Sequence, residues 1–432
     1  MPQYFSPGVY VEEVPSSVKA IAGVSTSTPG FIGVIPNTIQ LIAKDPSEEP
    51  TAETPVPTKY VDFDLLTAAP AKVPKLITNW TQFVKNFGGI VGDEETAKTT
   101  ETSPAIHEGH RYLAHAVYGF FNNGGSRCYV VRITDVTEMD AALKAFAAID
   151  EIALVSAPGV AIPAPGDTTD SVREALETHC VSVGDRFAIL DGPASIAEDK
   201  MGDLTKTVAD GGAMPPKSDY AAWYFPWIKV FDPATKLENP SGDGLLAVPP
   251  SGHMAGIYSR VDTDRGVHKA PANEVVRGAM NVTQQISKAD QNGLNPKGVN
   301  CIRSLNDNIL VWGARTVGGD ANADLKYINV RRTLLFLRES IDEGTQWVVF
   351  EPNTPALWQK ISRNVTAFLT NVWRSGALFG TTPQEAFYVK CDAETNPPEL
   401  REIGQVVTEI GVAIVRPAEF VIFRISQWQP SK

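Results

Sequence analysis

The chain has 432 residues, of which 43% are hydrophobic and 20% charged, and its formal net charge is -12 at pH 7. This length is too great for one compact core and predicts about two or three lobes. The acidic balance argues against broad binding of nucleic acid or of anionic membranes, because both need basic surface. No apolar run approaches the roughly 20 residues that cross a bilayer, and no secretory signal is visible. We therefore expect synthesis in the cytoplasm and no membrane insertion.

The first predicted element is a strand that has no obvious neighbour to pair with. Val9, Tyr10, Val11 and Val14 favour an extended conformation, and proline, glycine and serine bound the segment on both sides. The strand either belongs to the chain's own sheet or is donated to another molecule. The residues alone leave both interpretations open.

Strands and helices then alternate. After a short strand over residues 31–36, the stretch 40–75 is rich in proline, threonine and glutamate, which indicates an exposed insertion. A helix preceded by Thr78 or Asn79 follows, and Gly88 and Gly89 end it. The next predicted elements are a helix before Asn122, a strand at 128–133, a helix at 139–149, a strand at 152–158, a helix at 171–184 and a strand at 186–193. This order is typical of an α/β layer with a largely parallel sheet, and residues 219–233 add a buried strand.

The C-terminal third predicts two strong helices, near 326–342 and over 355–373, followed by strands. Thr354 is the expected cap of the second helix and Pro355 its first residue. The apolar stripe of that helix consists of Leu357, Ile361, Val365, Phe368 and Val372.

The same helix carries the basic residues Lys360, Arg363 and Arg374, which lie largely off the apolar stripe. No acidic residue occurs between Glu351 and Glu385, which is unusual in so acidic a chain. A basic helix face suits an acidic partner surface. A solvated face is the alternative interpretation.

Two strands are predicted at the end of the chain, one over 406–415 and one over 419–428, with Pro417 between them. Both faces of the second strand carry apolar residues: Val421, Phe423 and Ile425 on one, and Phe420 and Ile422, with Arg424, on the other. A strand of this kind pairs with its own sheet or fills the edge of another chain's sheet.

Four groups of residues hint at chemistry without completing a motif. His107, Glu108, His110 and His115 lack the spacing of a zinc protease helix, and we expect exposed histidines at a helix N-terminus. The stretch from Asp262 and Asp264 lacks the glycine and glutamate positions of a calcium loop. The cysteines, Cys128, Cys180, Cys301 and Cys391, are far apart and are expected to be reduced core thiols.

Asp191 is the remaining candidate, because it stands at a strand end, where α/β enzymes often place catalytic carboxylates. No phosphate-binding loop, dinucleotide fingerprint or nucleophile elbow accompanies it. We therefore predict no catalytic residue, metal or cofactor. A cytoplasmic α/β enzyme with a pocket near Asp191 stays the alternative.

Six stretches, read in order, resemble the contractile tail sheath family: the sheaths of myophage tails, R-type bacteriocins and extracellular contractile injection systems. They are YFSPGVYVEEVPSS, IAGVSTSTPGFIGV, AVYGFFNNGGSRCYVVRI, SGHMAGIYSRVDTDRGVHKAPAN, KYINVRRTLLFLRESI and RPAEFVIFRISQ. His268 departs from the pattern, since an aromatic residue is common there. The resemblance implies a multi-lobed α/β (α+β overall) subunit: an arm at 1–20, an α/β body at 21–300, a C-terminal domain at 301–405, and strands with a second arm at 406–432.

The resemblance also implies a function. Such a subunit polymerises helically around an inner tube and contracts to drive the tube through a target envelope. The terminal arms would pair with strands of neighbouring subunits, and the helix at 355–373 would face the tube through Lys360, Arg363 and Arg374. The implied partners are further copies, the inner tube protein, baseplate and terminal cap proteins, and a paralogous sheath protein. The product would be part of a virion tail or a tail-like injection particle; a static shell or tube subunit is a further alternative.

Overall fold

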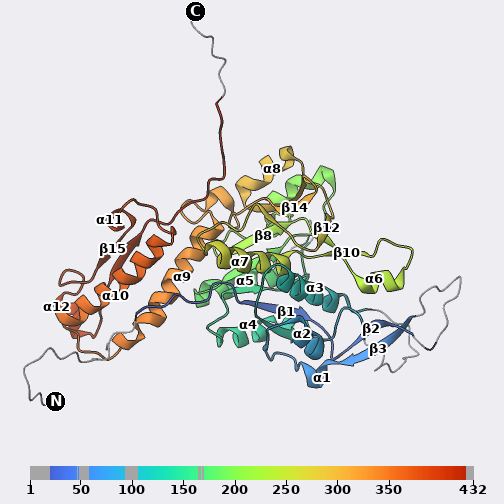
Figure 1. Cartoon of the computed structure of the whole chain (residues 1–432), viewed down its shortest axis with the longest axis horizontal. Helices are drawn as coiled ribbons and strands as arrows, with labels where there is room; N and C mark the ends of the chain where they lie inside the picture. The colour runs from blue at the N-terminus through green and yellow to red at the C-terminus, as the bar shows by residue number, and fades with distance from the viewer. Residues whose placement is uncertain are drawn as a thin grey trace, which may run out of the picture. The chain divides into compact units, whose positions relative to one another are not determined.

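The computed structural model describes residues 20–45, 47, 58–92, 106–163, 167 and 170–424. The chain forms two compact units (Figure 1): a larger one of Val24–Arg338 with Ile414–Lys432, and a smaller one of Met1–Gly23 with Glu339–Ala413. The boundary between them falls inside the helix α9 (Ile328–Thr345). It therefore differs from the boundary expected at residue 300, and residues 301–338 belong with the larger unit.

The larger unit is built on a nine-stranded sheet in the order β11-β14-β13-β8-β7-β6-β1-β5-β4. The strands from β13 to β5 in this order are parallel to their neighbours, as predicted, and β4, β14 and β11 are antiparallel. The bounds are β1 Pro29–Val34, β4 Lys75–Ile77, β5 Cys128–Ile133, β6 Leu154–Ser156, β7 Phe187–Asp191, β8 Ala221–Phe225, β11 Glu274–Val275, β13 Val299–Leu305 and β14 Asn308–Val311.

Helices cover both faces of this sheet. Alternate residues of β1 point to opposite sides: Phe31 packs in one core with α3 and α7, and Ile32 packs in the other with α4 and α5. Burial on both faces explains why the strands are nearly continuous apolar runs. The helices of this unit before α9 are α1 Leu65–Ala68, α2 Trp80–Phe87, α3 Glu108–Asn122, α4 Met139–Ala147, α5 Ser171–Val183, α6 Pro233–Glu238, α7 Ser251–Arg265 and α8 Lys288–Leu294.

Two smaller sheets flank the central one. The antiparallel sheet β10-β9-β12 consists of β9 Ile228–Phe231, β10 Leu245–Val248 and β12 Ala279–Val282. The hairpin of β2 (Thr38–Lys44) and β3 (Thr58–Asp64) overlaps the stretch 40–75, where we expected an exposed insertion. That expectation is wrong for the hairpin, because Leu41 and Val61 are buried in the same core as Phe31. The alternation of apolar residues in β2 is the signal that the proline- and threonine-rich composition obscured.

The smaller unit contains the end of α9, the long helix α10 (Pro355–Arg374) and a two-stranded antiparallel sheet of β15 (Phe387–Lys390) and β16 (Glu409–Val412). The short helices α11 Pro383–Ala386 and α12 Pro398–Glu402 complete it. Helix α10 begins as predicted, with the Thr354 side chain accepting a hydrogen bond from the amide of Leu357. The strand expected over 406–415 is shorter in the structure and pairs with β15 of its own chain.

The histidines of α3 are not exposed as we expected. His110 and His115 are 1% and 2% exposed, His110 contacts the Phe87 carbonyl at 2.9 Å, and His115 contacts Asp232 at 3.1 Å. Burial lowers the pKa of His110 to about 4, so it stays neutral inside the core at physiological pH. The reason is that other elements cover the two rings: the end of α2 lies against His110 through Phe87, and Asp232, which follows β9, lies against His115.

The described residues hold no group of three or more histidine, cysteine or acidic side chains arranged to bind a metal ion. All four cysteines are buried and free, as predicted, and burial raises the pKa of Cys301 to about 12. Of the helices that the structure describes, none is long and apolar enough to cross a membrane.

Close packing of α3 against α7 gives a test of this fold. A Cβ atom on Gly252 of α7 would lie 2.3 Å from the Ala116 Cα of α3, whereas one on Gly293 of α8 would meet nothing within 4 Å. We expect Gly252→Ala to lower the free energy of unfolding by about 1–3 kcal/mol through overpacking. Gly293→Ala should raise it by about 0.5–1 kcal/mol, since alanine favours helix. Denaturant titration of the isolated subunit measures both, and equal effects would contradict the packing described.

Candidate functional site

Asp191, the candidate for an enzyme site, has a structural position. It ends β7 and is 5% exposed, and its carboxylate accepts hydrogen bonds from the Ser251 amide at 2.8 Å and the Ser251 hydroxyl at 2.6 Å. Burial raises the pKa of Asp191 to about 7, although these hydrogen bonds oppose the rise. Ser251 is the first residue of α7, so the carboxylate attaches the start of that helix to the central sheet.

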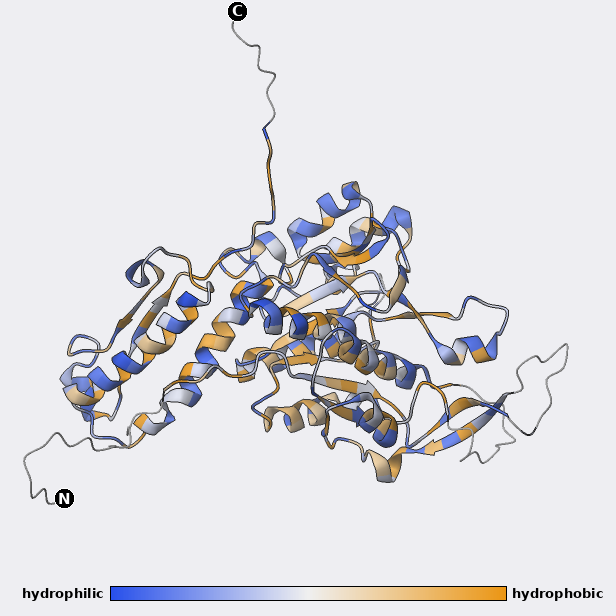
Figure 2. Ribbon diagram, in the orientation of Figure 1, coloured by the Kyte–Doolittle hydropathy of each residue, from blue (hydrophilic) through white to orange (hydrophobic). Residues whose placement is uncertain are grey.

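The C-terminal arm, which we define as residues 420–424, is the clearest candidate for a functional surface. Figure 1 shows it leaving the larger unit as an extended chain, and Figure 2 shows that it is mostly hydrophobic. Phe420, Val421, Ile422 and Phe423 are 70%, 69%, 77% and 85% exposed. Within the described residues, no backbone hydrogen bond joins this segment to a strand. Four consecutive apolar residues with both faces in water indicate a binding segment.

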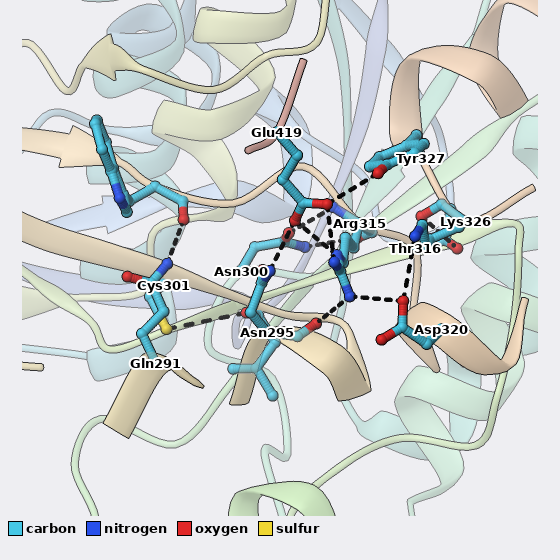
Figure 3. Close-up of polar contacts among 12 residues, drawn as sticks. Gln291, Asn295, Asn300, Cys301, Arg315, Thr316, Asp320, Lys326, Tyr327 and Glu419 are labelled. Atoms are coloured by element: carbon cyan, nitrogen blue, oxygen red, sulfur yellow. Dashed lines mark hydrogen bonds and ion pairs between the residues drawn. The ribbon is translucent and has the colours of Figure 1, made fainter. Parts of the chain in front are cut away.

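A dense polar cluster holds the root of the arm (Figure 3). One Glu419 oxygen accepts hydrogen bonds from Asn295 Nδ2 at 2.7 Å and Arg315 Nε at 2.8 Å. The other accepts from Arg315 Nη2 at 2.8 Å and from the Tyr327 hydroxyl at 2.9 Å. The Arg315 guanidinium thus binds the carboxylate with two parallel hydrogen bonds, which is the strongest and most directional form of this pair.

The surroundings of Arg315 fix it in place. Its side chain is 3% exposed, and its Nη1 donates to the Asn295 carbonyl at 3.1 Å and to Asp320 at 3.0 Å. Its own amide donates to the Asn300 side chain at 2.7 Å, and Asn300 belongs to β13 of the central sheet. The arm is therefore tied to the sheet through a short chain of hydrogen bonds.

The electrostatics agree with a permanently charged pair. Burial alone raises the pKa of Glu419, but the hydrogen bonds from Arg315, Asn295 and Tyr327 outweigh it and leave the pKa of Glu419 below its ordinary value. The carboxylate is therefore ionised at neutral pH.

The other predicted site residues are distributed as follows. Lys360, Arg363 and Arg374 are exposed on α10, on the face opposite its buried side chains Leu357, Ile361 and Val365. Val9, Tyr10, Val11 and Val14 of the N-terminal arm, and Ile425, which follows the C-terminal arm, lie outside the described residues. The structure therefore gives a position to the α10 face and to most of the C-terminal arm.

Sequence reasoning missed Glu419 and its partners. Glu419 and Arg315 are 104 residues apart, and no local pattern pairs them. The available signal was a single carboxylate between Pro417 and the apolar run that starts at Phe420.

Comparisons with known proteins agree with one another. The model of the phage tail sheath protein central domain matches residues 136–317, and that of the phage tail sheath C-terminal domain matches residues 320–427. The chain is 26% identical over 265 residues to the tail sheath protein of Burkholderia phage BcepMu, covering 58% of this chain and 51% of that one. A match to the tail sheath protein of Vibrio phage KVP40 is 24% identical over 180 residues, or 41% of this chain and 25% of that one. The matches thus span about half or less of these relatives.

Similar solved structures extend over the whole chain. A chain of the anti-feeding prophage baseplate is 27% identical with a TM-score of 0.66, covering 99% of this chain and 100% of that one. The anti-feeding prophage helical sheath in its contracted state is 26% identical with a TM-score of 0.67, covering 98% and 99%. The contracted PVC sheath, from an extracellular contractile injection system, shares the fold at 24% identity and a TM-score of 0.70, covering 99% of each chain.

The ion pair at the arm root predicts a pH-dependent contribution to stability. At pH 7, Glu419→Gln should lower the free energy of unfolding by about 2–3 kcal/mol, because it places an amide NH2 among hydrogen-bond donors and leaves Arg315 buried without its anion. The wild-type advantage is full above the unfolded pKa of about 4.3, and it is lost as the pH falls through the lower folded pKa of Glu419.

Denaturant titrations at neutral and acidic pH measure this difference, and Glu198→Gln, at an exposed acid of the same unit, is the matched control. A Glu419→Gln effect that is absent at neutral pH, or unchanged at low pH, would contradict the assignment.

Proposed function

Because more than half of the chain matches the two tail sheath models, the protein belongs to the phage tail sheath family, and we propose that it is a structural subunit of a contractile sheath. The observation that carries this proposal is the arm: four exposed apolar residues held rigidly at their root by Glu419 and Arg315. In a free subunit these apolar side chains stay in water and add no burial free energy. In an assembled lattice they would be buried in a contact between subunits.

The arms would link subunits by strand exchange. A donated strand forms backbone hydrogen bonds with an open sheet edge, and its alternate side chains fill pockets on both sides. The two-stranded sheet β15–β16 is a suitable acceptor, since a sheet of two strands is only marginally stable by itself and gains from further strands. The N-terminal arm, with Val9, Tyr10, Val11 and Val14, would act in the same way.

Contraction would follow from the assembly. Head-to-tail contacts that do not close into a ring generate helical polymers. In the proposed mechanism, subunits assemble in an extended, metastable lattice and then rotate as rigid bodies into a shorter and wider one, while the arms stay paired. The driving free energy is stored in the lattice during assembly. The doubly covered sheet of the larger unit suits this role, because tightly packed cores move as rigid units.

The proposed partners are further copies of this chain, the inner tube, the baseplate and a terminal cap, with assembly in the bacterial cytoplasm. The similar solved structures support association with further copies and with a baseplate, since they come from a helical sheath and a baseplate. They do not support the alternative of an enzyme at Asp191, and we propose no catalytic role.

Electron microscopy of arm deletions tests the proposal. Negatively stained wild-type protein, expressed with its neighbouring genes, should form hollow striated cylinders. Removal of residues 1–17, or of residues 420–432, should leave a folded subunit with no cylinders, because each deletion removes a donated strand. Folding is checked by the thermal midpoint. Wild-type protein that stays monodisperse and monomeric would overturn the sheath, and cylinders from both deletions would overturn the role of the arms.

The basic face of α10 would contact the inner tube. Lys360, Arg363 and Arg374 are exposed on a helix without acidic residues, in a chain whose net charge is -12. A tube with an acidic outer surface would complement this face, and complementary charge sets orientation and speeds association.

Charge reversal tests this contact. Lys360→Glu with Arg363→Glu should prevent assembly on tubes, because it opposes like charges across the contact. Lys288→Glu with Lys297→Glu makes the same change of net charge at exposed lysines of the larger unit and should leave assembly intact. Co-purification of sheath and tube, followed by microscopy, is the measurement. Equal assembly of the two double variants would defeat the assignment.

A further inference from the structure

The start of α9 contacts two segments of the larger unit that are far apart in the sequence, one at Thr26 and one at residues 415–419. Tyr327, immediately before α9, donates to Glu419 at 2.9 Å, and Asn329 Nδ2 donates to the Val415 carbonyl at 3.2 Å. Arg332 Nη2 donates to the Thr26 carbonyl at 2.8 Å. Six consecutive residues, 327–332, therefore hold the C-terminal segment at two points and the N-terminal segment at a third. We call this stretch the arm junction.

Several hydrogen bonds also hold the N-terminal segment at Thr26. Arg332 binds Asp262 of α7 with hydrogen bonds of 2.9 and 2.6 Å, and the Thr26 hydroxyl donates to the same carboxylate at 2.5 Å. The Arg332 side chain is 3% exposed, and its guanidinium lies over the ring of Tyr258 at 4.7 Å. Thr26 is thus bound through both its side chain and its backbone.

The arm junction is itself fixed to the body. The Ile328 amide donates to the Ala314 carbonyl at 3.0 Å, and the Thr316 amide donates to the Lys326 carbonyl at 2.8 Å. Between these two bonds, Arg315 forms an isolated bridge with Tyr327 and binds Asn300 of β13. Asn329 is 1% exposed, and its Nδ2 also donates to the His268 carbonyl at 2.7 Å. A stretch so tightly connected opens as one cooperative unit.

We propose that the arm junction is a positioning device that couples Thr26, in the segment that follows the N-terminal arm and which we call the N-terminal root, with Glu419, the C-terminal root, so that loosening one loosens the other. For the sheath, which rests on the function proposed above, this means that tension on one arm passes to the other through residues 327–332 and their partners. The hinges that allow subunits to rotate then lie outside the clamped residues, before Thr26 and after Glu419. The coupling is a property of the subunit and does not depend on assembly.

Hydrogen exchange of the dispersed full-length subunit tests the coupling. Thr26→Val removes one hydroxyl at the N-terminal root, and Glu419→Gln breaks the C-terminal root. Each variant should raise the exchange rate of two hydrogen-bonded amides by about tenfold or more, which corresponds to about 1.4 kcal/mol of local stability: that of Ala153, which donates to the Thr28 carbonyl at 3.0 Å, and that of residue 419, which donates to the Pro417 carbonyl at 3.1 Å. Thr26→Ser keeps the hydroxyl and should behave as wild type.

A second control separates the junction from its surroundings. Asp324→Asn removes an exposed ion pair with Arg416, at 3.8 Å, beside the C-terminal root but outside the junction, and it should change neither segment. If Glu419→Gln fails to fold, Tyr327→Phe decides the question, because it removes one hydrogen bond to Glu419 and leaves the ion pair with Arg315 intact.

The outcomes are distinct from those for the sheath itself. Faster exchange at both roots in a variant of either root supports the coupling, and faster exchange confined to the altered root overturns it. Wild-type cylinders test the sheath in a separate experiment, so either proposal fails alone. Where cylinders form, Thr26→Val and Glu419→Gln should both reduce their yield, whereas Thr26→Ser and Asp324→Asn should not.

Discussion

The position of the C-terminal arm depends on one interaction, the buried pair of Arg315 and Glu419. Arg315 is almost fully shielded from water, so its charge would be destabilising without partners. Its guanidinium donates to the Glu419 carboxylate, to the Asn295 carbonyl and to the Asp320 carboxylate. The planar guanidinium can bind Glu419 through two nitrogens while a third faces Asn295 and Asp320, which lysine could not do. This geometry gives the arm root one position and one direction.

The structure divides hydrophobic residues between two uses. In the larger unit they fill both faces of a parallel sheet and make a body that resists deformation. In residues 420–423 they lie in water, on both faces of an extended segment. Apolar side chains exposed in this way are typical of a surface that binds a partner, and we propose that neighbouring subunits cover them. In a lattice whose subunits rotate without separating, each subunit needs a rigid body and exposed apolar segments that are fixed to it at their base.

Much of the fold was predictable because its signals are local. The cap at Thr354 and the apolar stripe predicted the bounds of α10 to within one residue, and the alternation of helices and strands predicted the parallel sheet. The buried hairpin β2–β3 was not predicted, since its composition resembles a loop and its apolar alternation is short. Burial of His110 and His115 depends on tertiary contacts with Phe87 and Asp232, which no local pattern around the histidines shows. Glu419 and Arg315 meet only in the folded chain, and the function that we propose for the arm came from the family resemblance.

The most direct test of the central claim is a cryo-electron microscopy map of the wild-type protein assembled on its tube. We expect a helical sheath in which residues 420–424 run as a strand paired with a different subunit, while Glu419 stays bound to Arg315 of its own chain. A sheath in which those residues fold back onto their own subunit, or in which Glu419 has left Arg315, would contradict it.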